Sequence, residues 1–359
     1  MRAFLFFVGL VIAHSLWGGF SDAHGQEALL LDKMELVNHK LWMDYENGST
    51  LSAEDIVAKY QRNSLIKNTG RQVSYGFTSN TVWGVLEINQ NDYSVFTESI
   101  AEQSSITVPF LPLKIEIDNA WLDDIDIYFF ENGQRKHQVK LGDNQAHNAR
   151  LEDTRMPLVF YRFTQPETLV IFRFASQDPM TIPIYVGLPR AAKDKSTENA
   201  YFYGALYGSL IILLLYNLVL YSYLREQRYL LYSLYLLSFL VFNFTYTGHG
   251  FWWVWSESVS LQQWLMPVLM FFYLFSAVRF TIEFLNTQVY LPRLYRSRKY
   301  IYGVLVGLAV IIVLIGDRSF AVMSQLVVLT SIAIWMLCIG ILAYRNGDTL
   351  AKFFLPAIL

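Results

Sequence analysis

The stretch YFYGALYGSLIILLLYNLVLYSYL, residues 201–224, contains no charged side chain. A membrane-spanning helix needs about 20 consecutive apolar residues, because the hydrocarbon core is about 30 Å thick and a helix rises about 1.5 Å per residue. Further uncharged runs follow at residues 229–256, 258–278, 300–316 and 319–344, and another begins at Ala351. The sequence therefore predicts an all-α transmembrane helical bundle over residues 201–359, with five complete helices and the start of a sixth. Within the first helix, the buried amide of Asn217 is expected to bond to a neighbouring helix.

The loops between these runs predict the orientation of the bundle. Lys and Arg are enriched in cytoplasmic loops, so the side with more of them is the inner side. Alternate loops carry Arg225, Arg228, Arg293, Arg296, Arg298, Lys299, Arg345 and Lys352, whereas the opposite loops carry only Arg318. We therefore expect a multi-pass protein of a bacterial inner membrane with its N-terminal domain in the periplasm.

Residues 1–25 are typical of a signal peptide. Arg2 precedes the apolar stretch 3–13, and small residues around Ala23 offer a cleavage site. The alternative is an uncleaved anchor, for which the apolar stretch is short. Either interpretation places the following residues outside the cytoplasm.

Residues 26–190 show the two-residue alternation of half-buried strands. In 82–88, Trp83 and Val85 alternate with Val82, Gly84 and Leu86, and similar patterns mark residues 113–118 and 125–129. Other strands are predicted at 40–44, 158–163, 168–175 and 181–186, a hairpin at Asn132-Gly133, and a capped helix from Ser52 to Tyr60. Many short strands with little helix predict a periplasmic antiparallel β-sandwich of the jelly-roll-like type, and residues 191–200 form its linker to the membrane domain.

Composition and motifs argue against several classes of function. The formal net charge of −2 argues against a polyanion partner, so no nucleic acid is expected. Cys338 is the only cysteine, and the histidines lack paired ligand spacing, so neither a metal site nor a cofactor is expected. No nucleophile elbow or phosphate-binding loop occurs, so no catalytic residue is assigned and the chain is not expected to be an enzyme.

Aromatic side chains of the sandwich are the candidates for ligand binding. Trp83, Trp121, Tyr128 and Tyr161 could stack against a ligand such as a sugar ring. The competing interpretation is that aromatics at strand spacing form the core. Trp121 follows the turn-like stretch Asp118-Asn119-Ala120, where a side chain reaches solvent more readily.

Several ordered motifs resemble the bacterial seven-transmembrane receptors with diverse intracellular signalling modules. In the membrane region these are Tyr203-Gly204-Ala205-Leu206-Tyr207-Gly208, Leu215-Tyr216-Asn217-Leu218, Arg228-Tyr229-Leu230, Gly248-His249-Gly250, Phe284-Leu285 and Pro292-Arg293-Leu294. In the exported region, Leu41-Trp42-Met43-Asp44-Tyr45, Val82-Trp83, Glu116-Ile117-Asp118-Asn119, Asp124-Ile125-Asp126-Ile127-Tyr128 and Gly142-Asp143 resemble the family's type-2 extracellular module.

The resemblance implies a receptor that senses a periplasmic small ligand, such as a carbohydrate, and relays the signal through the bundle. A homodimer and a cytoplasmic output module, in cis or in trans, are implied partners besides the lipid bilayer. Such modules include diguanylate cyclases, histidine kinases and phosphatases. We expect this chain to be C-terminally truncated, because a run that ends at Leu359 is too short to cross a bilayer. The alternatives are a transporter with a periplasmic domain and a membrane-anchored carbohydrate-active protein.

Overall fold

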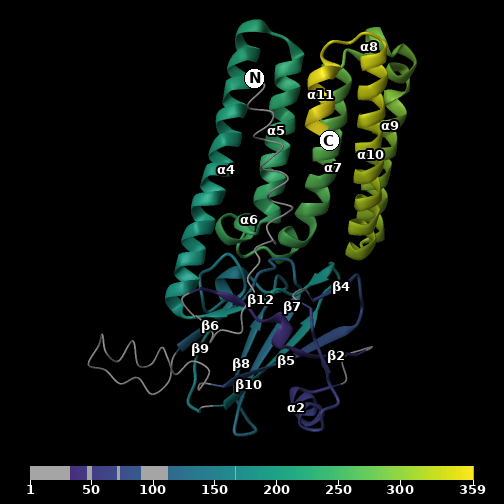
Figure 1. Ribbon diagram of the computed structural model, residues 1–359. Coiled ribbons are helices and arrows are strands. Elements are labelled where there is room, and N and C mark those ends of the chain that lie inside the picture. The colour runs from purple at the N-terminus through teal and green to yellow at the C-terminus, as the bar shows by residue number, and fades with distance from the viewer. Residues whose placement is uncertain (1–32, 47–50, 71–72, 90–111, 166, 359) are drawn as a thin grey trace. The chain divides into compact units, whose positions relative to one another are not determined.

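The computed structural model describes residues 33–46, 51–70, 73–89, 112–165 and 167–358. The predicted signal peptide, residues 1–25, lies outside them. The described residues divide into two compact units: one contains those up to Ala200 together with Thr245–Gln263, and the other contains Tyr201–Phe244 and those from Trp264 onward. The first unit is rich in antiparallel sheet and the second is helical, which confirms the predicted fold class (Figure 1).

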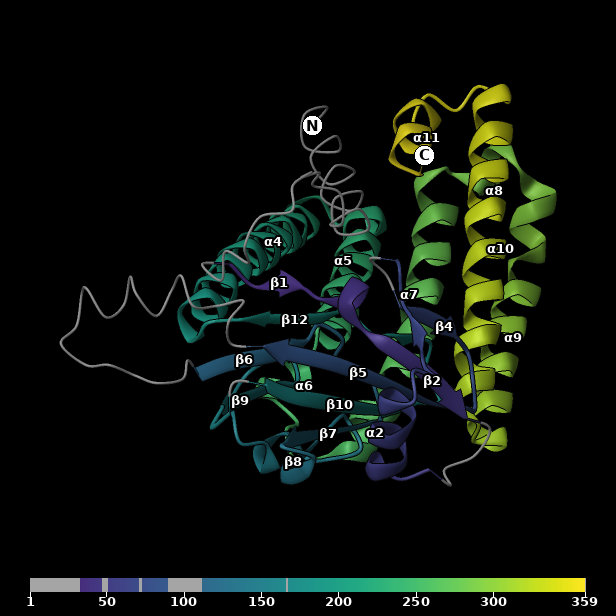
Figure 2. The ribbon, with the colours of Figure 1, turned by 60° about the horizontal axis from the view of Figure 1, so that its bottom comes forward.

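Two antiparallel sheets build most of the first unit. The six-stranded sheet has the order β3 (Ile66–Lys67), β2 (Trp42–Glu46), β5 (Thr81–Asn89), β10 (Glu167–Ala175), β7 (Asp124–Glu131) and β8 (Gln134–Leu141). The four-stranded sheet has the order β1 (Glu35–Leu36), β12 (Ile184–Gly187), β6 (Pro112–Ile117) and β9 (Leu158–Arg162). A short ribbon pairs β4 (Ser74–Gly76) with β11 (Met180–Thr181). Figure 2 shows the strand arrangement.

The strand alternation separates two apolar cores. Val82, Leu86 and Ile88 of β5 join residues of both sheets, among them Ile115 and Phe172, in the larger core. The opposite face of β5 carries Trp83 and Val85, which pack in a second core with residues of α2 (Ala53–Gln61). A strand alternates its side chains between faces, so one sheet contributes to both cores.

Local sequence signals fix the helix start and the hairpin turn that the sequence predicts. Ser52 and Asp55 form a capping box at the start of α2, because the Ser52 hydroxyl accepts the Asp55 N–H and the Asp55 carboxylate accepts the Ser52 N–H. Asn132 and Gly133 connect β7 to β8 with positive φ angles of 51° and 73°. Both elements therefore form where the local pattern predicts them.

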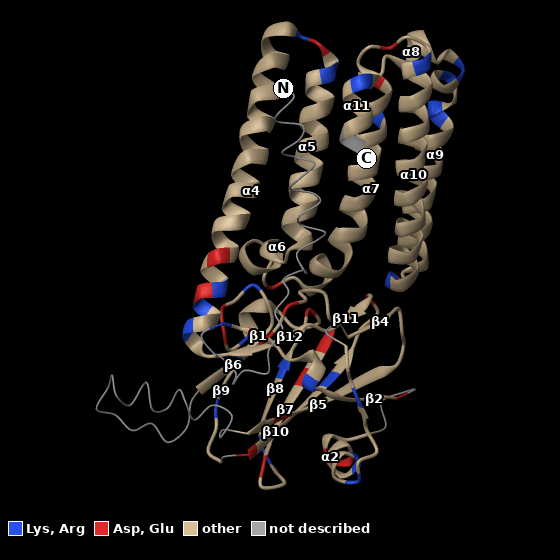
Figure 3. Ribbon diagram, viewed as in Figure 1, with Lys and Arg blue, Asp and Glu red and all other residues tan. Residues whose placement is uncertain are grey.

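Among the described residues, five helices are long and apolar enough to cross a membrane, and they supply most of the helical unit. They are α4 (Pro189–Leu224), α5 (Gln227–Tyr246), α7 (Val259–Phe284), α9 (Pro292–Ile315) and α10 (Arg318–Arg345). The shorter helices α8 (Thr287–Tyr290) and α11 (Ala351–Ile358) belong to the same unit, whereas α6 (His249–Trp253) belongs to the first unit. Figure 3 shows long uncharged stretches along these helices, with Lys and Arg at helix ends.

Two details of the helices differ from the sequence-based expectation. Residues 191–200, expected to be a linker, are helical and form part of α4. The amide of Asn217 does not reach a neighbouring helix for its hydrogen bond, and its Nδ2 donates to the Leu213 carbonyl one turn earlier in α4 at 2.8 Å. An interhelical amide bond does occur between α10 and α7, where Gln325 Nε2 donates to the Pro267 carbonyl at 2.8 Å.

Candidate functional site

A row of polar and aromatic side chains crosses the face of the six-stranded sheet that carries α2. The strand register places Asp44 beside Trp83, Trp83 beside Arg173, Arg173 beside Asp126, and Asp126 beside Lys140. These five residues come from β2, β5, β10, β7 and β8, and neighbours in register lie on the same face of a sheet. Segments far apart in the sequence therefore supply one continuous row on this face of the sheet.

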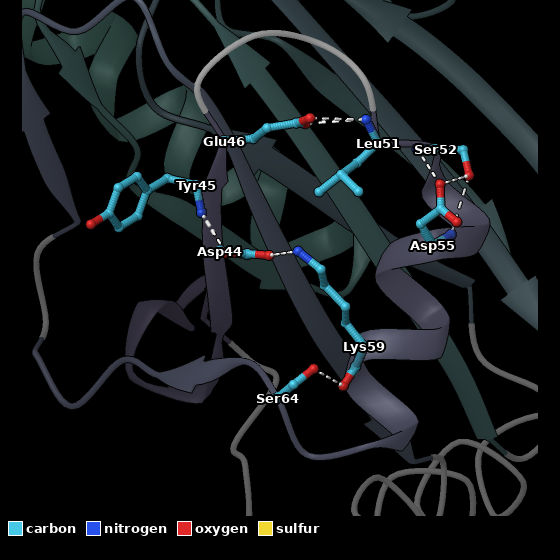
Figure 4. Close-up of polar contacts among 8 residues, drawn as sticks. All are labelled: Asp44, Tyr45, Glu46, Leu51, Ser52, Asp55, Lys59 and Ser64. Carbon is cyan, nitrogen blue, oxygen red and sulfur yellow. Dashed lines mark hydrogen bonds and ion pairs between the residues drawn. The ribbon is translucent and has the colours of Figure 1, made fainter.

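Two ion pairs include residues of this row. Arg173 Nη1 approaches Asp126 Oδ2 at 3.0 Å, and both side chains are largely buried, with 22% and 12% of their surface exposed. Lys59 reaches from α2 to Asp44 of β2, with Nζ and Oδ2 2.7 Å apart. Figure 4 shows this second pair, which ties α2 to the sheet. The arrangement presents both charge signs beside aromatic rings, which suits a polar ligand with an apolar face.

Hydrogen bonds hold the start of α2 beside β2. The Glu46 carboxylate accepts the N–H of Leu51, and the capping box follows directly at Ser52 and Asp55 (Figure 4). The hydrogen bonds from Ser52 lower the pKa of Asp55, so the capping carboxylate stays ionised. The helix therefore forms a fixed edge of the candidate face.

The structure separates the four aromatic residues that the sequence singles out. Trp83 and Tyr128 come together, with ring centroids 6.4 Å apart, on the face that carries α2. Trp83 is 1% exposed, whereas Tyr128 is half-buried and burial raises its pKa. Tyr161 lies in the larger core, where its ring stacks on Phe129 at 3.9 Å and its hydroxyl donates to Glu131 at 3.2 Å.

Trp121 lies apart from the other three, against the connection between α5 and α7. Its indole Nε1 donates to the Tyr246 carbonyl at 2.7 Å, and the two rings stack with centroids 6.4 Å apart. We name the connection Thr245–Gln263 the docking segment, because it belongs to the same compact unit as the sandwich. Sequence analysis identifies Trp121 but not its partner, because neither residue carries a local pattern that indicates the other.

Other sandwich residues that were not predicted also contact the docking segment, among them Arg155, Asp153 and His147. Arg155 Nη1 donates to the Thr247 carbonyl at 2.6 Å, and Asp153 Oδ1 accepts from Trp252 Nε1 at 2.6 Å. The backbone N–H of His147 donates to the Ser256 carbonyl at 2.7 Å. The motif Gly248-His249-Gly250 was the available sequence signal for this region, and it gave no indication of these partners.

Two family models match the chain, one over the helical region and one over the sandwich. The model for 7TM diverse intracellular signalling matches residues 199–359, and the model for the 7TMR-DISM extracellular 2 domain matches residues 39–187. The chain belongs to the 7TMR-DISM receptor family. A comparison with curated proteins finds no match. The 7TMR-DISM assignment confirms the resemblance drawn from the motifs and gives a multi-pass membrane protein with an N-terminal extracellular domain.

Both domains that the family models match are sensor and signalling domains. Among the described residues of this 7TMR-DISM receptor, no cluster of three His, Cys, Asp or Glu side chains has the arrangement of a metal site. The charged pairs of the candidate face are instead arranged as neighbours that neutralise one another. Such a face can bind a polar ligand through hydrogen bonds and ring stacking without a metal.

Proposed function

We propose that the sandwich of this receptor binds a small carbohydrate on the face beside α2 and that the helices relay the bound state to a cytoplasmic output module. The observation that supports this most is the contact of Trp83 with Tyr128 in a sheet face that also holds the Asp126–Arg173 and Asp44–Lys59 pairs. Sugars present an apolar ring face and several hydroxyls, so rings with nearby carboxylate and guanidinium groups match them.

The half-buried Tyr128 is the ring a ligand would meet first, and the deeply buried Trp83 packs beside it. Asp126 and Arg173 offer acceptors and donors in the same row. Trp121 and Tyr161 stay predictions as ligand contacts, and neither shares this face. The receptor is proposed to act as a homodimer in a bacterial inner membrane, with its output module in cis or in trans.

The test is calorimetric titration of the full chain in lipid nanodiscs with a panel of mono- and oligosaccharides. Tyr128→Ala is expected to weaken binding of the active sugar at least tenfold, because it removes the accessible ring. Phe160→Ala is the matched control, since Phe160 is an exposed aromatic, 39% accessible, on β9 of the other sheet. If no sugar binds, or if both variants weaken binding equally, the proposal is wrong. Net solute flux through proteoliposomes would favour a transporter, and sugar turnover would favour a carbohydrate-active protein.

A further inference from the structure

The docking segment makes contacts along most of its length with two loop regions of the sandwich, residues 119–123 and 142–157. At its start, Tyr246 and Thr247 accept hydrogen bonds from Trp121 and Arg155. In the middle, Trp252 donates to Asp153. Toward its end, Ser256 and Glu257 accept from His147 and Asn148, and Gln263 donates to Asn144. The contacts are therefore distributed rather than confined to one point.

Phe251 supplies an apolar contact at the centre of this interface. It is 3% exposed, its ring meets the His147 ring edge-on at 5.8 Å, and the Arg150 guanidinium lies 5.5 Å from its centroid. Neighbouring Trp253 is 63% exposed, so the segment presents one ring to the sandwich and another to its surroundings. A buried aromatic ring at the centre with hydrogen bonds around it is the usual anatomy of a specific interface.

Gly248 and Gly250 allow the segment to lie this closely. Gly248 has a φ of +83°, and a Cβ built there would lie 3.0 Å from the Ala120 Cβ of the sandwich. At Gly250 a Cβ would overlap the Trp255 ring, which packs across that position. Both glycines therefore serve the shape of the docking segment rather than local chain flexibility.

We infer that Thr245–Gln263 is a reversible latch, docked on the loops 119–123 and 142–157, through which the sandwich controls helices α5 and α7. The described contacts place many hydrogen bonds around one buried ring, Phe251, and contacts between parts of one chain that are more polar than a permanent interface are those expected to open and close. The segment continues directly into α5 and α7, whereas the sandwich itself continues only into α4. The sandwich is thus linked through this segment of the chain to two more helices. The docking itself is independent of the proposed function, and only the direction of control rests on it.

The first test measures docking without any ligand. In a Cys338→Ser background, Thr247→Cys and Trp253→Cys are labelled separately with a membrane-impermeant maleimide in spheroplasts. Thr247 is 8% exposed and Trp253 is 63% exposed, so the Thr247→Cys thiol should react at least tenfold more slowly. A second reporter, Ala120→Cys, samples the sandwich side, where Ala120 is 7% exposed. Equal rates for the protected and exposed thiols would overturn the inference.

The second test asks whether the Asp153 to Trp252 bond closes the latch. Asp153→Ala and Trp252→Phe should each raise the Thr247→Cys labelling rate several-fold, and the double variant should add nothing to either, since both remove the same bond. Glu152→Ala is the matched control, because this neighbouring acid pairs with Lys114 inside the sandwich at 3.0 Å. Additive effects, or an equal effect of Glu152→Ala, would overturn the latch. Loss of sugar binding with the latch intact would reject the proposed function alone.

Discussion

Substituting alanine at Gly248 should open the docking segment, and the structure gives the size of the effect. An L-residue at a φ of +83° costs about 1–2 kcal/mol in backbone strain. The added Cβ would lie 3.0 Å from the Ala120 Cβ, against an ordinary carbon contact of about 3.5–4.0 Å, and such crowding costs about 1–3 kcal/mol. Together these costs amount to about 2–5 kcal/mol, and about 1.4 kcal/mol changes an equilibrium constant tenfold.

The assay is the labelling rate of the Thr247→Cys thiol, which reports the open population. Gly248→Ala should raise this rate at least thirtyfold. Adding Ala120→Gly removes the crowding but not the strain, so the rate should fall back to about tenfold above the parent. Gly316→Ala is the matched control, since Gly316 also has a positive φ, +71°, with no neighbouring atom within 4 Å of its built Cβ.

Two results would refute this reasoning. A parental labelling rate in Gly248→Ala would show that neither strain nor crowding acts on the docked state. A rate that Ala120→Gly leaves unchanged would show that the segment does not approach Ala120, and the described interface would then be wrong.

Three further predictions concern pH, a buried carboxylate and an interhelical bond. Burial, with the nearby Arg155 charge as the second cause, lowers the pKa of His249 to about 4, and burial also lowers that of His147. The docked state therefore favours neutral imidazole, so docking should be constant above about pH 6.5 and weaken as the pH falls toward 4. The loss for His249 is about 1–2 kcal/mol after allowance for solvent screening. Labelling of Ala120→Cys, normalised to Trp253→Cys, should show this dependence, and His249→Asn should remove the part of it that His249 contributes and leave the part due to His147. Glu131 is fully buried and accepts hydrogen bonds from Tyr161 and Thr164, so Glu131→Gln should destabilise the sandwich by about 2–3 kcal/mol in pulse proteolysis, against about 1 kcal/mol for Tyr161→Phe. Gln325→Leu removes the bond to the Pro267 carbonyl and should cost the helical unit about 0.6–2 kcal/mol in detergent unfolding, and an unchanged midpoint would show that this bond is not stabilising.

The elements that sequence predicts well are those whose signal is local. The alternation of Val82, Leu86 and Ile88 with Trp83 and Val85 reflects two faces with different cores, and β5 forms there. The capping box at Ser52 requires only residues three apart. Uncharged runs give the five long helices for the same reason, because length and hydropathy are properties of one segment.

The candidate site was less predictable because it depends on register between distant strands. Asp44 and Lys140 are far apart in sequence, and pairing through β5, β10 and β7 brings them into one row. The two-residue alternation predicts that Trp83 and Tyr128 each point to one face of their own strand. It does not predict that both point to the same face of the sheet. For Tyr161 the strand spacing favoured the core over a ligand contact, and the structure places its ring in the core.

The aromatic cluster after α5 shows the same limit. Phe251, Trp252, Trp253 and Trp255 have the composition of an interfacial belt, and Trp253 is exposed as such a residue would be. Phe251 instead packs on His147, and Trp252 bonds to Asp153. Composition alone cannot distinguish a ring that faces lipid from one that faces a folded domain, since both require apolar surface with a polar rim.

The docking segment also constrains how the chain crosses the membrane. A segment that hydrogen-bonds to the sandwich must lie on the same side of the bilayer as the sandwich. The chain between them contains α4 and α5, so it crosses an even number of times, and two spans satisfy this requirement. The positions of Arg225 and Arg228 in the α4–α5 turn lead to the same orientation from loop charge alone. Hydrogen bonds on the outer side of the membrane and basic residues on its cytoplasmic side thus indicate the same orientation independently of each other. From this side, we expect α7 to lead inward to the basic start of α9, α9 outward to Asp317 and α10 inward to Arg345, which would place the end of α10 on the cytoplasmic side.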